Sequence, residues 1–385
     1  MATVTQQPAN AGAPTAATSM AFRANTQKTI KRPGVVLTAA LGNPLPDTQI
    51  PPTTLLRCIY IEVTGVTASN AATVAFQPDA PLNVFSSVNF HDAQGTSIVG
   101  SFDSFTLAMA QKWFGFTNNS DVTTSAVYSV TSGVGSGLGG SFSMVFRIPV
   151  EAVSRTGVGS QINTDTQSPL VLSLTLNTSA AIYSTAPTTA PTVSAVVSYG
   201  GYWNQSGNPN TFSTPTAVGT LNYINWTNYT GLAGQQQFQL SNIGLGNAVR
   251  NLMFINRLAS GNARSDTAFA NPLQIAYRGN VLGQWSELLW KHEMSEAYNF
   301  SNPVPDAGIG TVAPSATPGL NVGVYNRWFN DDFVSDPGNE LFYALLNTAV
   351  GDSVELTGSW ATASTLYEVI NFLAVSGPLS AIQGH

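Results

Sequence analysis

Residues 88–115, VNFHDAQGTSIVGSFDSFTLAMAQKWFG, combine two strands and a helix in one short unit. The segments VNF and TSIVG flank the turn-forming cluster HDAQG, which predicts a β-hairpin. Ser101 can cap the helix that follows, and Asp103 falls in its first turn, where the helix dipole favours an acid. Apolar residues at steps of three or four predict the buried face of this helix: Phe102, Phe105, Met109 and Trp113.

The same order of elements returns at residues 273–300, LQIAYRGNVLGQWSELLWKHEMSEAYNF. Strand LQIAY, turn RGN and strand VLG precede a second helix, for which Ser286 is the candidate cap. Trp290, Met294 and Ala297 recur at helical spacing and predict its buried face.

An internal duplication extends beyond these two units. Gly100 and Gly283 stand at the same place before each helix, 183 residues apart. Upstream, LLRCIYIEV around Arg57 resembles AVRNLMFINRLA around Arg250 with a shift of 193, and a ten-residue difference in one loop accounts for the change. Short strand-like runs punctuated by glycine and proline make up the rest of both halves, as is typical of antiparallel sandwiches and barrels.

These patterns predict five segments. A flexible basic arm (1–34) precedes a first β domain (35–203), and a linker or loop excursion (204–234) leads to a second β domain (235–376) and a short tail (377–385). The linker is assigned by composition, since it is polar, uncharged and interrupted by glycine and proline.

Charged residues make up only 9% of the 385-residue chain, against roughly 25% in ordinary soluble domains. Such a surface is poorly protected against association. The first 46 residues hold four bases and no acid, whereas the remainder holds 10 bases and 20 acids, which would oppose binding to nucleic acid. The four bases mark a candidate assembly or membrane-facing element, with a frayed terminus as the simpler alternative: Arg23, Lys28, Lys31 and Arg32.

Known catalytic and cofactor motifs do not fit this sequence. The string GSGLGG (135–140) matches a dinucleotide-binding pattern, but a strand follows it where a helix is required. His292 and Glu293 begin a zinc-protease pattern, but Glu296 stands where the second histidine is needed. Cys58, the single cysteine, lies in an apolar run and is expected in the core. We therefore expect no enzyme activity and no cofactor.

One acidic segment, NDDFVSDPGNE, is a candidate cation site through Asp331, Asp332 and Asp336. It lacks the spacing of an EF-hand, and its Asp-Pro-Gly sequence favours a turn, so a solvated acidic loop is the simpler interpretation. No apolar run approaches the ~18 residues of a membrane span, and the N-terminus lacks the layout of a secretory signal.

Sparse charge, a basic arm and two β domains that each carry a strand, turn, strand and helix resemble the double jelly-roll major capsid proteins of tailless icosahedral viruses, in particular the tectivirus-like phages with an internal membrane. Residues 88–115 and 273–300 carry the resemblance, which covers about 30–376 in layout. It implies an all-β chain of two tandem eight-stranded jelly rolls, each with a short helix after the strand-turn-strand unit.

The same resemblance implies a structural role in the virion, after assembly in the host cytoplasm. Homotrimers with a pseudo-hexagonal footprint would tile an icosahedral shell and meet vertex (penton) and minor virion proteins. The N-terminal arm would face an internal membrane, with no direct sequence-specific contact to nucleic acid. Long loops would rise outward as towers, and the loops assigned as towers or inter-domain excursions are 115–140, 200–234 and 301–320.

The same residues also fit other classes of protein. The chain could be a single-jelly-roll, spike or fibre protein of a virion. It could also be a carbohydrate-binding, adhesin-like β-sandwich, in which Trp203, Trp226 and Tyr229 stack on sugars, although packing of a long loop explains the same aromatics. A β-rich glycosidase needs two carboxylates about 5 to 9.5 Å apart, which a sequence does not reveal.

Overall fold

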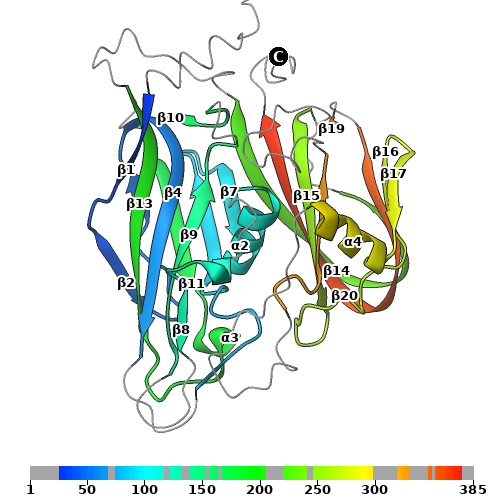
Figure 1. Cartoon of the computed structure of the whole chain (residues 1–385), viewed down its shortest axis with the longest axis horizontal. Helices are drawn as coiled ribbons and strands as arrows, with labels where there is room; N and C mark the ends of the chain where they lie inside the picture. The colour runs from blue at the N-terminus through cyan, green and yellow to red at the C-terminus, as the bar shows by residue number, and fades with distance from the viewer. Residues whose placement is uncertain are drawn as a thin grey trace, which may run out of the picture.

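The structure is a computed structural model, and it describes residues 26–67, 74–116, 122–131, 139–152, 157–163, 167–204, 220–240, 246–297, 319–329, 346–348 and 352–374. Two β-rich lobes lie side by side, and helix α2 (Ser104–Trp113) stands between them (Figure 1).

Among its described residues, the first lobe consists mainly of strands, with three short helical segments. Besides α2 these segments are η1 (Val122–Thr124) and α3 (Ser179–Ile182). The strands are β1 (Thr26–Lys31), β2 (Val36–Ala40), β3 (Thr48–Ile50), β4 (Thr53–Val66), β5 (Ala75–Phe76), β6 (Phe85–His91), β7 (Ser97–Phe102), β8 (Ser129–Thr131), β9 (Ser141–Pro149), β10 (Gln161–Asn163), β11 (Leu170–Leu176), β12 (Tyr183–Thr185) and β13 (Thr192–Asn204).

Most of these strands form two facing layers, and β5 and β12 form a separate pair. One sheet has the order β1-β13-β4-β9-β8, and the other contains β7-β6-β11-β3. The alternation in SFSMVFRIP is that of a strand with one buried face: Phe142, Met144 and Phe146 are buried, whereas the residues between them are half-buried. Phe146 meets Phe85 of the opposite sheet with ring centroids 6.0 Å apart, so the first core lies between the sheets.

In its described part, the second lobe is built from one helix and from strands that belong to the same sheet as β7-β6-β11-β3 of the first lobe. Its elements are β14 (Leu221–Gln239), β15 (Ala248–Leu258), β16 (Leu273–Tyr277), β17 (Asn280–Trp285), α4 (Glu287–Ala297), β18 (Val324–Trp328), β19 (Leu346–Asn347) and β20 (Val354–Ala374). The long strand β20 pairs with β14 along most of its length, with β16 near its start and with β15 near its end. Trp290 of α4 is fully buried against Phe254 of β15 and Phe269, at centroid distances of 6.0 and 5.9 Å.

The predicted hairpin-helix unit is confirmed in both lobes, as β6-β7-α2 and β16-β17-α4. A β-bulge in one strand of each lobe aligns the two lobes residue by residue. The ladder between β4 and β13 skips Arg57, and the ladder between β15 and β20 skips Arg250, so each arginine is the bulged residue of its strand. The shift of 193 residues inferred from the sequence is thus the structural equivalence of β4 and β15.

The predicted N-terminal cap is confirmed for α4 and wrong for α2. Ser286 caps α4 as predicted, because its Oγ accepts the Leu289 N–H at 3.2 Å. Ser101 instead lies in β7, and Asp103 is the cap of α2, with its Oδ1 accepting the Thr106 N–H at 2.7 Å. The strand continues through Ser101 because Phe102 is buried next to β6.

The loop expected over 204–234 is wrong for its second half, since residues 221–234 belong to β14. Composition suggested a loop, but LNYINWTNY places β-branched and aromatic residues in a strand that β20 completes with a long antiparallel ladder. Residues 205–219 lie outside the described residues, as does most of the arm. Its last part, expected to be flexible, is strand β1, which pairs with β13 over six residues.

Of the predicted tower loops, residues 117–121, 132–138, 205–219 and 301–318 likewise lie outside the described part of the chain. Within that part, no helix is long and apolar enough to cross a bilayer.

Candidate functional site: the seam between the lobes and the outer faces

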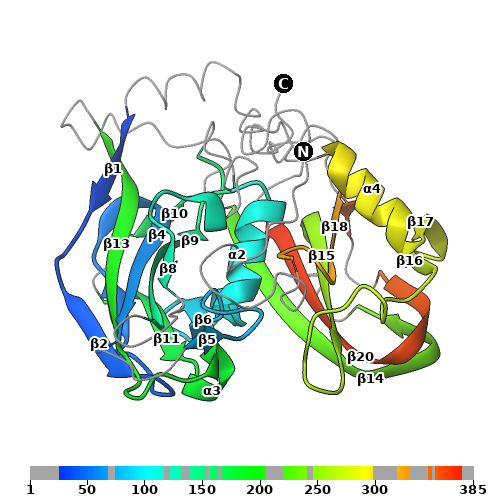
Figure 2. The ribbon, with the colours of Figure 1, turned by 60° about the horizontal axis from the view of Figure 1, so that its bottom comes forward.

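Helix α2 is buried along its whole length, whereas its counterpart α4 is not. All ten residues of α2 are buried, including Gln111 and Lys112. A helix that lies on the surface of a sandwich keeps a polar face in water, so complete burial requires cover on both sides. Figure 2 shows the cause: α2 faces β15 and β20 of the second lobe across the seam, while α4 lies on the outer side of that lobe.

Donors from the second lobe satisfy the free carbonyls at the C-terminal end of α2. Nη1 of the bulged Arg250 donates to the Phe114 carbonyl oxygen at 2.9 Å. The indole Nε1 of Trp328 donates to the Trp113 carbonyl oxygen at 2.6 Å. Because the last carbonyls of a helix lack partners within the helix, these bonds fix α2 to the second lobe in one register.

A buried cluster of charges joins the lobes near the N-terminal end of α2. Asp79 of the first lobe pairs with Arg264 at 2.7 Å and with Arg257 at 2.6 Å, both from the second lobe. The two guanidinium groups lie over the ring of Phe105 in α2, 4.6 and 5.6 Å from its centroid. Burial alone would raise the pKa of Asp79, but the two arginines outweigh it and lower that pKa.

A second polar cluster holds α4 to the strand that follows it. Lys291 Nζ lies 3.2 Å from Oδ1 of Asp266 and donates hydrogen bonds to the carbonyl oxygens of Asn321 and Val324. Its three N–H groups therefore have three acceptors. Burial lowers the pKa of Lys291 to about 8. Tyr325 donates to the same Asp266 oxygen at 2.6 Å. Because every N–H group of the Lys291 amine is bonded to Asp266 or to the segment around β18, this polar cluster anchors α4.

The bases predicted in the arm lie at the edge of the outer sheet of the first lobe. Lys28 and Lys31 are exposed on β1. Arg32 forms a bidentate salt bridge with Glu62, in which Nε and Nη2 donate to the two carboxylate oxygens at 3.2 and 3.1 Å. Arg23 lies outside the described residues, so the structure brings three of the four bases together on one edge. The cation candidates also lie outside them: Asp331, Asp332 and Asp336.

The other motif residues fall into structural roles. His292 pairs with Glu296 at 3.2 Å on the exposed side of α4, and Cys58 is buried as expected. Among the described residues, no group of three or more histidine, cysteine, aspartate or glutamate side chains could hold a metal ion.

Two of the three aromatics considered for sugar stacking are packed against other rings. Trp226 stacks on Tyr367 at 5.6 Å, and Tyr229 contacts Phe238 at 4.4 Å. The hydroxyl of Tyr229 donates to the buried carboxylate of Glu368 at 2.7 Å. These contacts favour the packing interpretation of the aromatics in β14, while Trp203 on β13 is half exposed.

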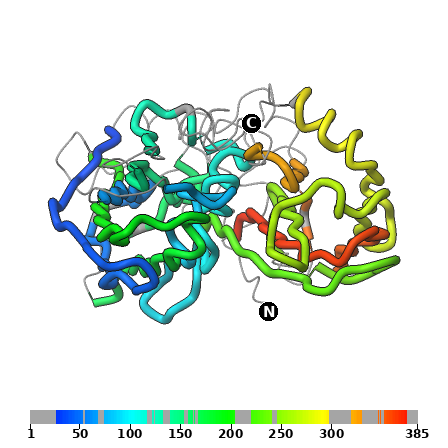
Figure 3. Tube along the Cα trace, turned by 90° about the horizontal axis from the view of Figure 1, so that it is seen from below, coloured from blue at the N-terminus to red at the C-terminus, as the bar shows by residue number. Residues whose placement is uncertain are grey.

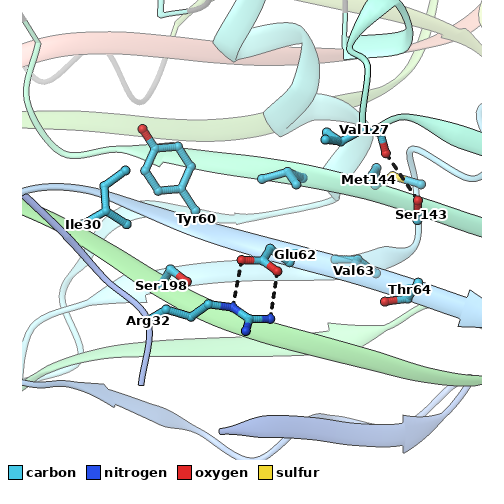
Figure 4. A pocket seen from close by; sticks show the side chains of 11 residues that line it. Ile30, Arg32, Tyr60, Glu62, Val63, Thr64, Val127, Ser143, Met144 and Ser198 are labelled. Atoms are coloured by element: carbon cyan, nitrogen blue, oxygen red, sulfur yellow. Dashed lines mark hydrogen bonds and ion pairs between the residues drawn. The ribbon is translucent and has the colours of Figure 1, made fainter. Parts of the chain in front are cut away.

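The outer face of the first lobe carries an open groove of about 510 Å³ (Figure 4). It runs over the sheet face that does not contact the first core. Ile30 on β1 and Val127 before β8 line it and are more than half exposed. Its other lining residues belong to β4, β9 and β13 or lie just after β1: Arg32, Tyr60, Glu62, Val63, Thr64, Ser143, Met144, Val145 and Ser198. Exposed apolar side chains in such a groove mark a surface suited to association.

Comparison with known proteins identifies the fold. The sequence matches no family model and no curated protein. The STIV MCP matches with a TM-score of 0.61 and 11% identity over 91% of this chain and 97% of that chain. The major capsid protein P2 of bacteriophage PM2 gives 0.52 and 9% over 92% and 99%, and the PBCV-1 virus capsid gives 0.56 and 13% over 90% and 94%. The predicted double jelly roll is therefore confirmed as the fold of this chain.

Proposed function

We propose that the protein is the major capsid protein of an icosahedral virus, and that its trimers tile the virion shell. The observation that carries this proposal is the likeness to viral major capsid proteins over about nine-tenths of this chain and nearly the whole of those chains. A structural role agrees with buried ionic clusters that hold the lobes together and with a charge content of 9%.

Sparse charge has a direct physical use in a shell. Subunits of a coat bury their lateral faces against neighbours, and many weak contacts add through multivalency. Charged groups that keep soluble monomers apart would have to be desolvated in those faces. A chain whose function is association, with no catalytic step, is expected to have few of them.

The proposed partners are further copies of the chain, then vertex and minor virion proteins. Three arm bases on and beside β1 could also approach an anionic membrane surface, at about 1 kcal/mol of attraction per base. We propose the virion as the location, after assembly in the host cytoplasm.

Sedimentation of the purified full chain, followed by negative-stain microscopy, tests the proposal. We expect a trimer of about three times the 40.4 kDa chain mass, and hexagonal capsomers or shells in the images. A stable monomer at micromolar concentration would contradict it. Binding of that monomer to a glycan array would then favour a carbohydrate-binding protein.

A further inference from the structure

A cleft of about 550 Å³ lies where the two lobes meet, beside the start of α2. Figure 3 shows the lobes side by side, the first coloured from blue to green and the second from green to red, and both contribute to the walls. This volume falls within the roughly 300–1,000 Å³ of small-molecule sites. The walls include Gln77, Asp79 and Asp103 of the first lobe and Arg257, Ala263 and Arg264 of the second.

The charged groups in the walls of the cleft balance one another. Their two carboxylates belong to Asp79 and Asp103, and their two guanidinium groups belong to Arg257 and Arg264. The two oxygens of Asp79 pair separately with the two arginines, at 2.6 and 2.7 Å. Nη1 of Arg264 also donates to three main-chain carbonyl oxygens. Because these charges are already paired within the protein, the walls favour a neutral ligand over an ion.

Some hydrogen-bonding atoms at the surface of the walls have no partner among the described residues. Asp103 accepts a backbone N–H of α2 with Oδ1, which leaves Oδ2 as a free acceptor. Gln77 donates its Nε2 to a main-chain carbonyl oxygen at 3.1 Å, which leaves Oε1 as a second acceptor. Arg257 uses Nη1 for Asp79 and for a main-chain carbonyl oxygen, which leaves Nη2 as a donor. These atoms are not sealed from solvent, so a ligand in the cleft can reach them.

The carboxylate of Asp103 is poorly solvated where it lies. Burial raises the pKa of Asp103, although the charge of Arg257 and the hydrogen bond from Thr106 act in the opposite direction. Hydrogen bonds to an ionised acceptor are roughly twice as strong as those between neutral groups. A ligand that donates to Oδ2 would therefore replace solvation that the cleft withholds.

We propose that this cleft binds a small neutral polyhydroxyl compound, such as a monosaccharide. A hydroxyl group both donates and accepts, which matches free acceptors on one wall and a free donor on the other. Neighbouring hydroxyls would donate to Asp103 Oδ2 and Gln77 Oε1, and another would accept from Arg257 Nη2. An anion would meet the free acceptors and a cation would meet the guanidinium groups, so both fit less well. The site goes beyond the proposed capsid function and is compatible with it.

Saturation-transfer NMR on the full chain tests the site, with D-glucose, D-galactose and D-mannose as millimolar probes. We expect transfer from the protein to at least one of these sugars. Ala263→Trp should abolish it, because this exposed alanine lines the cleft and a bulky side chain there fills the space. Ala93→Trp is the matched control, since Ala93 is exposed in the turn between β6 and β7, and it should keep the signal. No transfer to any of the three sugars, or an equal signal in Ala263→Trp, would overturn the inference.

Asp103→Asn tests the recognition itself. Asparagine keeps an acceptor for the cap of α2 but replaces the free Oδ2 with an amide donor, so circular dichroism should show an unchanged fold. We expect the affinity for the bound sugar to fall by about tenfold or more in this variant. Inorganic phosphate and spermidine, added as competitors, should not displace the sugar. An unchanged affinity in Asp103→Asn, or displacement by either ion, would show that the cleft does not select a neutral hydroxyl ligand and would overturn the inference.

Discussion

The Nε–H of Arg264 in the second lobe donates a hydrogen bond of 2.7 Å to Oδ1 of Asp79 in the first lobe, inside a buried cluster that also contains Arg257. Removing the carboxylate leaves two buried guanidinium groups without their counter-ion. We expect Asp79→Ala to lower the free energy of unfolding by about 3 to 5 kcal/mol, measured by urea denaturation. Arg278→Gln, which breaks an ion pair at an exposed arginine, is the control and should have a much smaller effect. Equal effects of the two variants would contradict this account of the seam.

A second buried carboxylate predicts how stability depends on pH. Burial raises the pKa of Glu368 from 4.5 to about 7, although the hydrogen bond from Tyr229 acts in the opposite direction. The folded state then binds this proton more tightly than the unfolded state. The contribution to stability is complete below about pH 4.5 and is lost as the pH rises through 7, a change of about 3 kcal/mol.

Glu368→Gln isolates this effect, because the amide keeps an acceptor for Tyr229 and carries no charge at any pH. We expect the variant to be more stable than the wild type at pH 8, and the difference to shrink towards pH 5. Urea midpoints measured across this range provide the test. A difference that does not change with pH would show that Glu368 is not the titrating group.

The sequence predicts the parts of this fold that local pattern determines. Hydrophobic spacing placed both helices and the buried Trp290, and the resemblance of the segments around Arg57 and Arg250 aligned the two lobes. The Asp79 cluster could not be predicted, because its partners are 178 and 185 residues away in the chain and nothing local links them. Strand β14 was missed for a related reason, since a polar, uncharged strand is identified only by the ladder that β20 supplies.

Gly100, the glycine before α2, is expected to tolerate no side chain. Gly100 has φ +115°, and a Cβ there would lie 2.0 Å from the Val88 carbonyl oxygen. We expect Gly100→Ala to prevent accumulation of folded protein, measured as soluble yield and by circular dichroism. Gly95→Ala is the matched control, since Gly95 also has a positive φ (+85°) but no atom within 4 Å of the added Cβ. Its effect should be limited to roughly 1 kcal/mol of backbone strain.

Substitutions of Asp103, the cap of α2, are expected to lower the free energy of unfolding by a smaller amount that depends on the residue introduced. Asp103 Oδ1 accepts the Thr106 N–H, and an asparagine retains this acceptor. Asp103→Ala should lower the free energy of unfolding by about 1 to 2 kcal/mol, and Asp103→Asn by less. Equal losses in both variants would show that the charge of Asp103 near Arg257, rather than the cap, is the important feature.

Truncation of the N-terminus separates the strand from the charges of the arm. Removing residues 1–25 leaves β1 in place, whereas removing residues 1–32 deletes β1, exposes the edge of β13 and removes Ile30. We expect the shorter truncation to keep the trimer in sedimentation and the longer one to lose it.

A chain with Lys28, Lys31 and Arg32 all changed to glutamine keeps β1 but loses three bases. This variant should remain a trimer, because Ile30 and the β1–β13 ladder are intact. Its binding to vesicles of anionic lipid should be weaker than that of the wild type, by about 1 kcal/mol per base that reaches the surface. If both proteins bind the vesicles equally, these bases do not contact a membrane. If the trimer is lost instead, the charges belong to the contact between copies, and the pair between Arg32 and Glu62 becomes the first position to test.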